Sequence, residues 1–544
     1  MSAAKAKAKA KARGAKTAGA KTPVAKKAVA KKAVAKKPVA KKPVAKKPVA
    51  KKPVAKKPVA KKPVAKKPVA KTPVAKKPVA KTPVAKTSGH GDDRAVRDRL
   101  LRAAEHAIAT ARALGVDAAE VSVAVGHELE VSVRKGAVEL VKEAGSSGLS
   151  VRVIRNGAVA TSSTTDLQPD AVVAFLRRAV EMAAVSEPDP MAAPPAKREL
   201  AKRWPTLELF DPVTDGIDAD QAIALATKAE AVAMRADKRI TASEGASFGR
   251  SSGRSVLATT GGFLGERAGT YQSLVVQAVA DDAGGKKRNG VYWSGGRFFA
   301  ELESPEAVGK EAARRALEQL GAIKLDTCVM PVVFDKDAAR GIVGLLAGCV
   351  LGDSIYRERS YLARKLGERV ASKHVTIVDD PLVPRGPGSR AFDGEGRGVQ
   401  RLTVVDKGKL QTFLLDTYSA RKLGSKPTGS AGGGGGIPHA STSNFFLLPG
   451  KHAPAALLQG IERGLYVQRM MGFGFDPTNG NFSRGAEGFL IEHGKLTVPV
   501  GEITISRNLD ELLKGIDRVA NDLDHRTATA SPSFRVDAMT IAGA

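Results

Sequence analysis

The stretch ELEVSVRKGAVELV, residues 128–141, alternates apolar and polar side chains on both sides of a Lys-Gly pair. The similar stretch LSVRVIRNGAVATS, residues 149–162, is divided in the same way by Asn156-Gly157. Alternation of this kind is typical of a strand with one buried face, and a residue followed by glycine at such a place favours a two-residue hairpin turn. The sequence therefore predicts two antiparallel hairpins here.

Helical patterns lie on either side of these hairpins. In residues 94–115, apolar side chains recur at spacings of three and four, which is the pattern of a helix with one buried face. Pro169 and Pro305 each stand at the start of another helical pattern, where proline is well tolerated. Asp218 and Gln221 have the spacing of a capping box. We therefore expect helices before, between and after the strands.

Two further glycine turns occur near the C-terminus. Alternating stretches meet at Lys407-Gly408 and again at His493-Gly494, and both arrangements predict hairpins. Together with the helical patterns, they indicate an α+β fold with antiparallel sheets.

Changes in composition divide the chain into a tail and three domains. A repeat of Lys, Ala, Pro and Val fills the N-terminal part, and a proline-rich linker separates the first globular unit from the second. The last part is rich in strand patterns. The expected segments are 1–90, 91–205, 206–325 and 326–544.

The tail carries nearly all of the net charge. Residues 1–87 contain 29 lysines and Arg13 and no acidic residue, so they hold +30 of the formal +33. The rest of the chain is almost neutral, because its 58 basic side chains (88 less the 30 of the tail) face 55 acidic ones. The basic character of the protein therefore concerns the partners of the tail and not the fold of the body.

The repeat itself predicts a disordered, extended tail. Prolines recur every five residues from Pro38 to Pro83, and like charges leave little apolar surface to bury. Without aromatic side chains the tail cannot stack on bases, so we predict nonspecific binding to DNA or RNA phosphates. A solubilising spacer is the alternative. The lysines expected to bind are Lys36, Lys37, Lys41, Lys42, Lys46, Lys47, Lys51 and Lys52.

Three short motifs of the body do not form a catalytic signature. His127-Glu128 lies in an alternating, strand-like stretch, and no second histidine follows one helical turn later. Ser247 stands in a Gly-x-Ser-x-Gly match that no helix follows, and the five glycines at 432–436 lack the Gly-Lys-Ser/Thr of a phosphate loop and suggest a mobile connector. From these residues alone we predict no catalytic residue and no metal ligand.

Cysteine content and hydropathy indicate a cytosolic protein. The chain contains only Cys328 and Cys349, which excludes a disulfide framework and fits a reducing compartment. The uncharged run GIVGLLAGCVLG, residues 341–352, is too short to cross a bilayer, so no membrane association is expected. The basic tail could bring such a protein to the nucleoid.

Several segments of the body resemble the PmbA/TldE branch of the TldD/PmbA family, formerly described as modulators of DNA gyrase and now grouped with metalloproteases. The most specific are DTYSARKLGSKPTGSAGG at 416–433 and GNFSRGAEGFLIEHGKLTVPVGEITISRNL at 480–509. A third is TSSTTDLQPDAV at 161–172. The resemblance runs from about residue 95 to the end and leaves the tail outside. It implies an N-terminal α/β unit, a largely β C-terminal domain and a substrate channel enclosed between subunits.

The TldD branch of that family carries an HExxxH zinc motif, and this chain departs from it. The corresponding region, residues 340–367, contains no histidine and no carboxylate before Asp353. The resemblance therefore implies a subunit without a cofactor of its own, whose TldD-like partner in a heterodimer holds the zinc. An enclosed channel would admit short or unfolded peptides.

The matching blocks also suggest residues of a substrate cleft. Arg421 and Lys422 could orient a peptide carboxylate or acidic groups of the partner, although solvated surface charge is the alternative. Ser483 and Arg484 form a polar turn that could contact substrate or only cap a strand. The complete set of predicted cleft residues is Ser419, Arg421, Lys422, Thr428, Ser483 and Arg484.

Three functions are consistent with these observations. The favoured hypothesis is the metal-free subunit of a TldD/TldE-type metallopeptidase complex, because the resemblance covers the whole body. A structural protein that acts on nucleic acid through its tail is the second hypothesis. A peptidase that works alone, through a site without a recognisable motif, is the third.

Overall fold

The computed structural model describes residues 93–543. The predictions for the tail, including its disorder and its DNA-binding lysines, lie outside these residues. Within the described range, no helix is both long and apolar enough to cross a membrane.

A six-stranded antiparallel sheet forms the N-terminal half of the described chain, with the strand order β3-β2-β1-β4-β5-β6. Four of its strands are 17 to 20 residues long. The bounds are β1 (Ala118–Arg134), β2 (Ala137–Arg155), β3 (Ala158–Thr164), β4 (Ile240–Thr259), β5 (Leu264–Asp281) and β6 (Lys287–Gly296).

The two predicted N-terminal hairpins are confirmed, and they share a strand. β1 and β2 meet at Lys135 and Gly136, whose φ angles are 52° and 73°, and β2 and β3 meet at Asn156 and Gly157, with φ of 52° and 74°. Positive φ at both turn residues is the geometry that a two-residue hairpin requires and that glycine or asparagine adopts most readily. β2 therefore runs without interruption through both hairpins.

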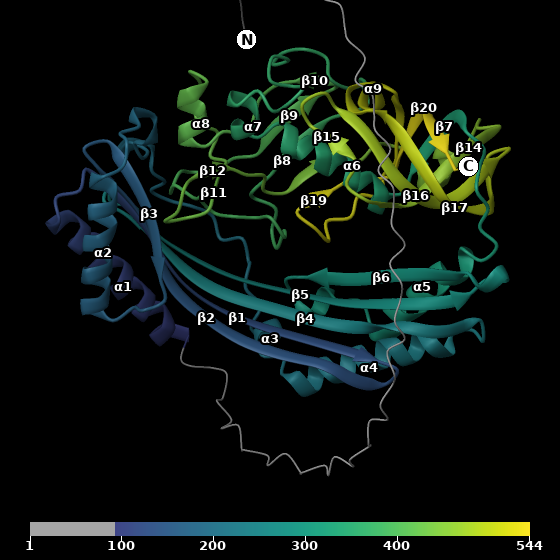
Figure 1. The fold of residues 1–544 in the computed structure, drawn as a ribbon, viewed down its shortest axis with the longest axis horizontal. Coiled ribbons are helices and arrows are strands. Elements are labelled where there is room, and N and C mark those ends of the chain that lie inside the picture. The colour runs from purple at the N-terminus through teal and green to yellow at the C-terminus, as the bar shows by residue number, and fades with distance from the viewer. Residues whose placement is uncertain (1–92, 544) are drawn as a thin grey trace, which may run out of the picture. The chain divides into compact units, whose positions relative to one another are not determined.

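Two pairs of helices cover one face of this sheet (Figure 1). Val121 and Val123 of β1 pack under the first pair, and Val131 and Val133 of the same strand pack under the second. All four are odd-numbered, so one face of a single strand serves two separate cores. The first pair is α1 (Asp93–Ala113) and α2 (Pro169–Ala184), and the second is α4 (Ala219–Arg235) and α5 (Pro305–Glu318).

The predicted helix starts are confirmed. Pro169 and Pro305 occupy the first turns of α2 and α5. The carboxylate of Asp218 accepts the amide of Gln221 at 2.8 Å, and the Gln221 side chain accepts the amide of Asp218 at 3.1 Å, which completes the capping box of α4. The remaining short helices of this half are α3 (Pro212–Asp215), η1 (Pro190–Ala192), η2 (Lys197–Glu199), η3 (Ala283–Gly285) and η4 (Phe299–Glu301).

The central sheet contains strands from both sides of the boundary that we placed at residues 205 and 206. β1 pairs with β4 over 14 residues, from Glu120↔Thr259 to Val133↔Ala246. The segments 91–205 and 206–325 therefore contribute separate helix pairs to one continuous sheet.

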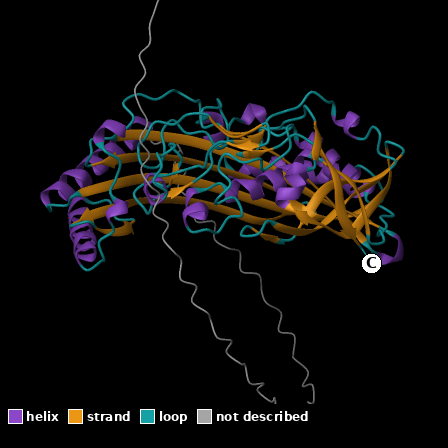
Figure 2. Ribbon diagram, turned by 90° about the horizontal axis from the view of Figure 1, so that it is seen from above, coloured by secondary structure: helices purple, strands orange, loops and turns teal. Residues whose placement is uncertain are grey.

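The C-terminal part lies against the other face of this sheet and contains three further sheets (Figure 1). Loops occupy much of it (Figure 2). A seven-stranded sheet contains β7 (Cys328–Phe334), β14 (Arg463–Met471), β15 (Phe475–Asp476), β16 (Asn481–Glu492), β17 (Lys495–Asn508), β18 (Ile516–Val519) and β20 (Phe534–Ala542). A five-stranded sheet contains β8 (Ile377–Asp379), β9 (Leu402–Asp406), β10 (Lys409–Leu410), β13 (Phe445–Leu447) and β19 (Thr529–Ala530), and β11 (Ala431–Gly432) pairs with β12 (His439–Ala440).

The predicted hairpins of this part are confirmed, but its sheets are not wholly antiparallel. Lys407-Gly408 and His493-Gly494 turn with positive φ at all four positions. However, β14 pairs with β7 in parallel, and β13 pairs with β19 in parallel. Parallel pairing needs a long crossover, which the alternating pattern of a single strand cannot reveal. The helices here are α6 (Lys336–Cys349), α7 (Gly352–Tyr356), α8 (Thr417–Lys422), α9 (Leu509–Lys514) and η5 (Pro454–Leu457).

Candidate functional site

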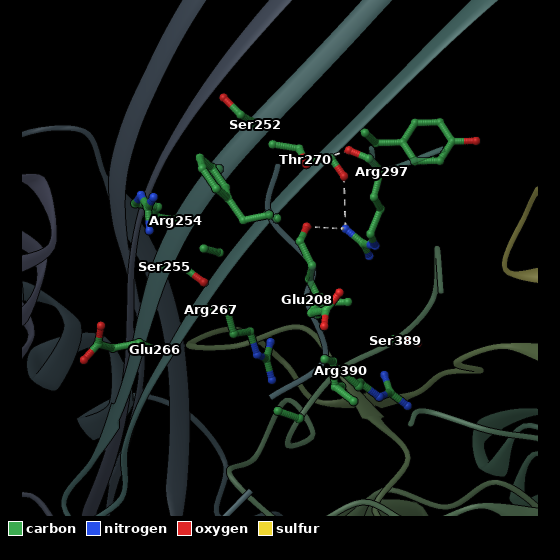
Figure 3. A pocket seen from close by; sticks show the side chains of 18 of the residues that line it. Glu208, Ser252, Arg254, Ser255, Glu266, Arg267, Thr270, Arg297, Ser389 and Arg390 are labelled. Carbon is green, nitrogen blue, oxygen red and sulfur yellow. Dashed lines mark hydrogen bonds between the residues drawn. The ribbon is translucent and has the colours of Figure 1, made fainter. Parts of the chain in front are cut away.

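A cavity of about 850 Å³ opens beside β5, at the place where β6 stops pairing with it (Figure 3). β6 pairs only with residues 272–281 of β5, so residues 266–271 are left with a strand edge. The extended segment 204–210 lines the cavity next to this edge, and residues 389–391 of the C-terminal part contribute to its wall. The cavity therefore lies where three distant parts of the chain meet.

Arg297 fastens these parts together through backbone carbonyls. Its guanidinium donates to Thr270 of β5 at 3.1 Å and to Leu209 of the extended segment at 3.4 Å. It also donates to Gly386 at 3.0 Å and to Pro387 at 2.7 Å, in the C-terminal part. All four acceptors are neutral, so Arg297 positions the walls of the cavity and keeps its positive charge.

Arg267 and Arg390 also line the cavity, and neither forms an ion pair. Nη2 of Arg267 donates to the carbonyls of Phe392 at 2.9 Å and Asp393 at 2.7 Å. Arg390 donates to the hydroxyl of Ser441 at 2.8 Å and to its carbonyl at 3.2 Å. Among residues 93–543, no carboxylate oxygen lies within 4.0 Å of either guanidinium. The Nε atom of each is enclosed and lacks a hydrogen-bond partner in the described chain.

Burial acts on both of these side chains more strongly than the carboxylates near them. Burial and, after it, the positive charge of Arg390 lower the pKa of Arg267 to about 10, although the carboxylate of Asp393 acts in the opposite direction. The pKa of Arg390 is also lowered, chiefly by burial, although the carboxylates of Asp379 and Asp393 act in the opposite direction. A buried cation without a partner is costly, so this wall of the cavity favours an anion.

The remaining charged side chains of the lining have partners of their own. In Figure 3, Arg254 and Glu266 lie on the left of the view and Arg390 lies farther to the right. The guanidinium of Arg254 also covers the ring of Phe210, 4.3 Å from its centre. The ion pairs are Arg254 with Asp93, Glu266 with Arg97, and Glu208 with Arg385.

Trp204 gives the cavity an apolar wall next to the two unpaired arginines, and the buried rings of Phe263 and Phe392 pack behind it. Trp204 is 38% exposed and lies 5.1 Å from the ring of Phe392 and 5.6 Å from that of Phe263. The guanidinium of Arg267 stacks over the Phe392 ring at 4.4 Å. The cavity can therefore hold a ligand with both an anionic and an apolar part.

Comparisons with known proteins cover most of the described chain. Domain 1 of the PmbA/TldA metallopeptidases matches residues 119–183, the central domain matches 213–320, and the C-terminal domain matches 327–543. The metalloprotease PmbA of Escherichia coli O157:H7 is 36% identical over 81% of this chain and 96% of its own length. This chain belongs to the PmbA/TldD family.

Structural relatives of this PmbA/TldD-family protein share its fold. A modulator of DNA gyrase from Bacteroides thetaiotaomicron is 26% identical, with a TM-score of 0.76 over 81% of this chain and 98% of its own. TldE from Thermococcus kodakarensis has the same fold at 21% identity, with a TM-score of 0.72 over 81% of this chain and all of its own.

Two further matches are to sequences. A TldD homologue from Haemophilus influenzae is 30% identical over 49% of this chain and 61% of its own. Residues 1–128 also match a family of histone H1-like nucleoproteins.

Four of the predicted cleft residues of this family member lie in or beside α8. Arg421 donates to the carbonyls of Met191 at 3.0 Å and Pro194 at 3.1 Å, so it holds the proline-rich linker. Ser419 is buried and bonds to the Asp416 side chain that caps the helix. These contacts support the fold, and a role in substrate binding stays a prediction.

The other predicted cleft residues are divided between two places. Lys422 lies 5.2 Å above the ring of Tyr418, and Thr428 bonds to the backbone of Leu415. Ser483 and Arg484 belong to β16 in the seven-stranded sheet. The fold thus brings four of the six predicted residues together and leaves the last two in a different sheet.

A second cavity of about 390 Å³ lies next to α8. Asp353, Tyr356, Tyr418 and His439 contribute to its lining, but none of the six predicted cleft residues does. Among residues 93–543, no group of three His, Cys, Asp or Glu side chains is placed to hold a metal ion.

Sequence analysis missed Arg267, Arg390 and Trp204. Each is an ordinary residue in its local context, and only the pairing of distant segments brings the three to one cavity. A signal existed in ERAGTYQSLVVQ, residues 266–277, where polar and charged positions precede a buried run along the same strand. The glycine run, which we expected to be a mobile connector, packs on the sheet: a Cβ on Gly435 would lie 2.4 Å from the carbonyl oxygen of Ser150.

Proposed function

We propose that this protein is the metal-free subunit of a two-subunit metallopeptidase and that it helps a TldD-type partner bind short or unfolded peptides. One observation carries the proposal. By the family resemblance, helix α6 spans the region that corresponds to the zinc-binding helix of TldD, and it contributes Ile342, Val343 and Leu346 to the core. A catalytic zinc needs about three protein ligands, and these three side chains of the helix are apolar and cannot bind a metal.

The other candidate ligands in this region do not fit zinc either. Cys349 is fully buried, and burial raises the pKa of its thiol to about 12, which disfavours the thiolate that binds metal. Asp353 opens α7, but no histidine stands within a helical turn of it. We therefore assign the zinc to the partner and derive no chemical step from this chain alone.

Peptides are the substrate class that the cavity supports. Its volume and its mixture of arginine and aromatic walls suit a few residues of an extended chain, whereas a folded protein could not enter it. Membership of a family whose relatives are named metalloproteases supports the same class.

Reconstitution tests this function. The single chain should bind no stoichiometric zinc and cleave no unfolded peptide. Addition of a TldD-type subunit that carries HExxxH should give a peptidase that chelators inhibit. A matched partner whose HExxxH glutamate is replaced by glutamine should give no activity. Peptidase activity and tight zinc in the purified single chain would contradict the proposal and favour a peptidase that works alone.

The match of residues 1–128 to a histone H1-like nucleoprotein favours a second role. We propose that the tail binds nucleic acid without sequence preference. Binding of a 30-base-pair duplex should weaken steeply with salt, by about 0.9 in log affinity per log salt for each phosphate engaged. Deletion of residues 1–87 should abolish it. If the truncated body bound the duplex as well, the tail would not be the anchor.

A further inference from the structure

The cavity beside β5 contains two arginines whose charges the described chain does not neutralise. Arg152, on the same sheet, has an acidic partner in Glu120 at 2.7 Å. Arg267 and Arg390 have hydrogen bonds only to neutral oxygens, and they repel each other. The structure thus lacks a negative charge at a place where burial makes one favourable.

The acidic side chains whose charges act on these two arginines are already engaged elsewhere. Asp393 accepts the amides of Glu395 at 3.0 Å, Arg397 at 2.8 Å and Ala431 at 3.2 Å, so it is held by the loop that it organises. Asp379 accepts the amide of Ser443 at 2.7 Å. Both lie beyond ion-pair distance of the two arginines. They cannot turn to the cavity without breaking these bonds.

We propose that Arg267 and Arg390 form a binding site for a carboxylate of a peptide, either its terminal α-carboxylate or an acidic side chain. Guanidinium groups bind carboxylates through short, charge-assisted hydrogen bonds, often two at a time. This inference rests on the proposed function only in taking a peptide as the ligand. The site itself belongs to this chain and needs neither the partner nor a metal.

The aromatic wall favours a peptide over a small inorganic anion. Trp204 lies over Phe392, whose ring also carries the guanidinium of Arg267. A carboxylate at the arginines would therefore place the neighbouring side chain of its peptide against an apolar surface. We expect an apolar residue at the end of the peptide to bind more tightly than glycine.

Calorimetric titration of the full chain with three matched peptides tests the site. The first is acetyl-Ser-Ala-Ser-Ala-Ser-Leu with a free carboxylate, the second is its amide, and the third is an amide with glutamate in place of leucine. The acid should bind about tenfold more tightly than the leucine amide, or better. If the glutamate amide matches the acid, the site accepts a side-chain carboxylate, and if it matches the leucine amide, the site reads the chain terminus.

Arginine variants separate this site from the basic tail, which also attracts carboxylates. Arg267→Gln and Arg390→Gln keep the tail, and each should abolish the preference for the acid without changing the affinity for the leucine amide. Arg267→Lys keeps the charge and should retain part of the preference. The control is Arg364→Gln, which removes one positive charge at a side chain that is 85% exposed and outside the cavity lining. It should bind like the wild type.

Three results would overturn the site. They are equal affinity of the wild type for acid and amide, a preference that survives in both glutamine variants, and no binding of either peptide up to about 1 mM. Circular dichroism spectra and melting curves of the variants establish that they are folded. Because no partner is present, loss of the site and failure of the reconstituted peptidase are separate outcomes.

Discussion

Arg152 and Arg267 lie on strands of the same sheet, but only Arg152 has a carboxylate paired with its guanidinium. Arg152 of β2 donates to Glu120 at 2.7 Å, and both side chains are almost fully buried. Burial is the largest single influence on the pKa of Arg152 and lowers it, but the charge and hydrogen bond of Glu120 outweigh it together with the charges of Glu395 and Asp416, so the pKa is raised. Arg267 of β5 has no such partner and its pKa is lowered. Arg152 is the more buried of the two, so the paired carboxylate and not the exposure accounts for its raised pKa.

The difference separates an arginine with an ion pair inside the fold from one without. Around Arg152, carboxylates are in excess, and they include Glu120, Glu395 and Asp416. Around Arg267, the charge of Asp393 acts from beyond ion-pair distance, and Arg390 adds a second positive charge. We expect substitutions in the first region to affect folding and substitutions in the second to affect binding.

The largest expected effect is that of Glu120→Ala. The substitution leaves Arg152 buried without its partner, so the free energy of unfolding should fall by about 3–5 kcal/mol. Urea denaturation followed by circular dichroism at pH 7 measures this. The matched control is Glu266→Ala, which breaks a more exposed pair between β5 of the same sheet and Arg97 of α1 and should cost at most about 1 kcal/mol. Equal losses in both variants would remove the distinction between the two regions.

An effect of comparable size across the whole pH window, but smaller per pH unit, concerns Glu395, which is buried within the excess of carboxylates. Burial, followed by the charges of Asp393 and Glu120, raises its pKa to about 8. An unfolded glutamate titrates near 4.3, so between about pH 4.5 and pH 8 the folded protein holds a proton that the unfolded chain has lost. Stability should therefore fall as pH rises through this window, by up to about 1.4 kcal/mol per pH unit.

Glu395→Gln cannot ionise and should lose most of this pH dependence. Urea midpoints at pH 5, 6, 7 and 8 for the wild type and the variant measure the difference. Thr417, which donates its amide and hydroxyl to one oxygen of Glu395, can donate to the glutamine oxygen as well, so the variant should fold. The same slope in both proteins would show that another group causes it.

Substitution of Arg421 should cost less in the free energy of unfolding than Glu120→Ala and more than a substitution on the surface. It donates to the carbonyls of Met191 and Pro194, and Arg421→Ala should therefore cost about 1–2 kcal/mol in the free energy of unfolding. Lys422→Ala, its neighbour over the Tyr418 ring, should cost less than about 1 kcal/mol. Thermal melting and peptide titration of both variants measure this. Loss of peptide binding without loss of stability in Arg421→Ala would support the cleft role that its sequence block suggested.

The smallest effect on stability is expected for Arg390→Gln. No ion pair is lost, and removal of a buried charge offsets the loss of the hydrogen bonds to Ser441. The free energy of unfolding should change by less than about 1 kcal/mol in either direction. Urea denaturation of Arg390→Gln and Glu120→Ala under the same conditions compares their free energies of unfolding directly. A loss as large as that of Glu120→Ala would mean that Arg390 supports the fold.

Much of the local structure could be predicted from the sequence because it depends on neighbouring residues. The four turns at Lys135, Asn156, Lys407 and His493 each need positive φ at two adjacent positions, and the following glycine provides it. The starts of α2, α4 and α5 follow from side chains within one turn. The family resemblance likewise rests on contiguous blocks. The net charge of the tail follows from its amino-acid composition alone.

Only the tertiary structure decided which of these elements meet. β1 pairs with β4 across the proline-rich linker, and β7 pairs in parallel with β14. Such pairings form because distant segments bury more apolar surface when they join one sheet. The same packing directs Arg421 to the linker, pairs Arg152 with Glu120, and leaves Arg267 and Arg390 unpaired in one cavity. Whether an arginine supports the fold or is free to bind a ligand depends on whether a carboxylate from a distant part of the chain packs against it. A local sequence pattern does not show which distant residues come into contact.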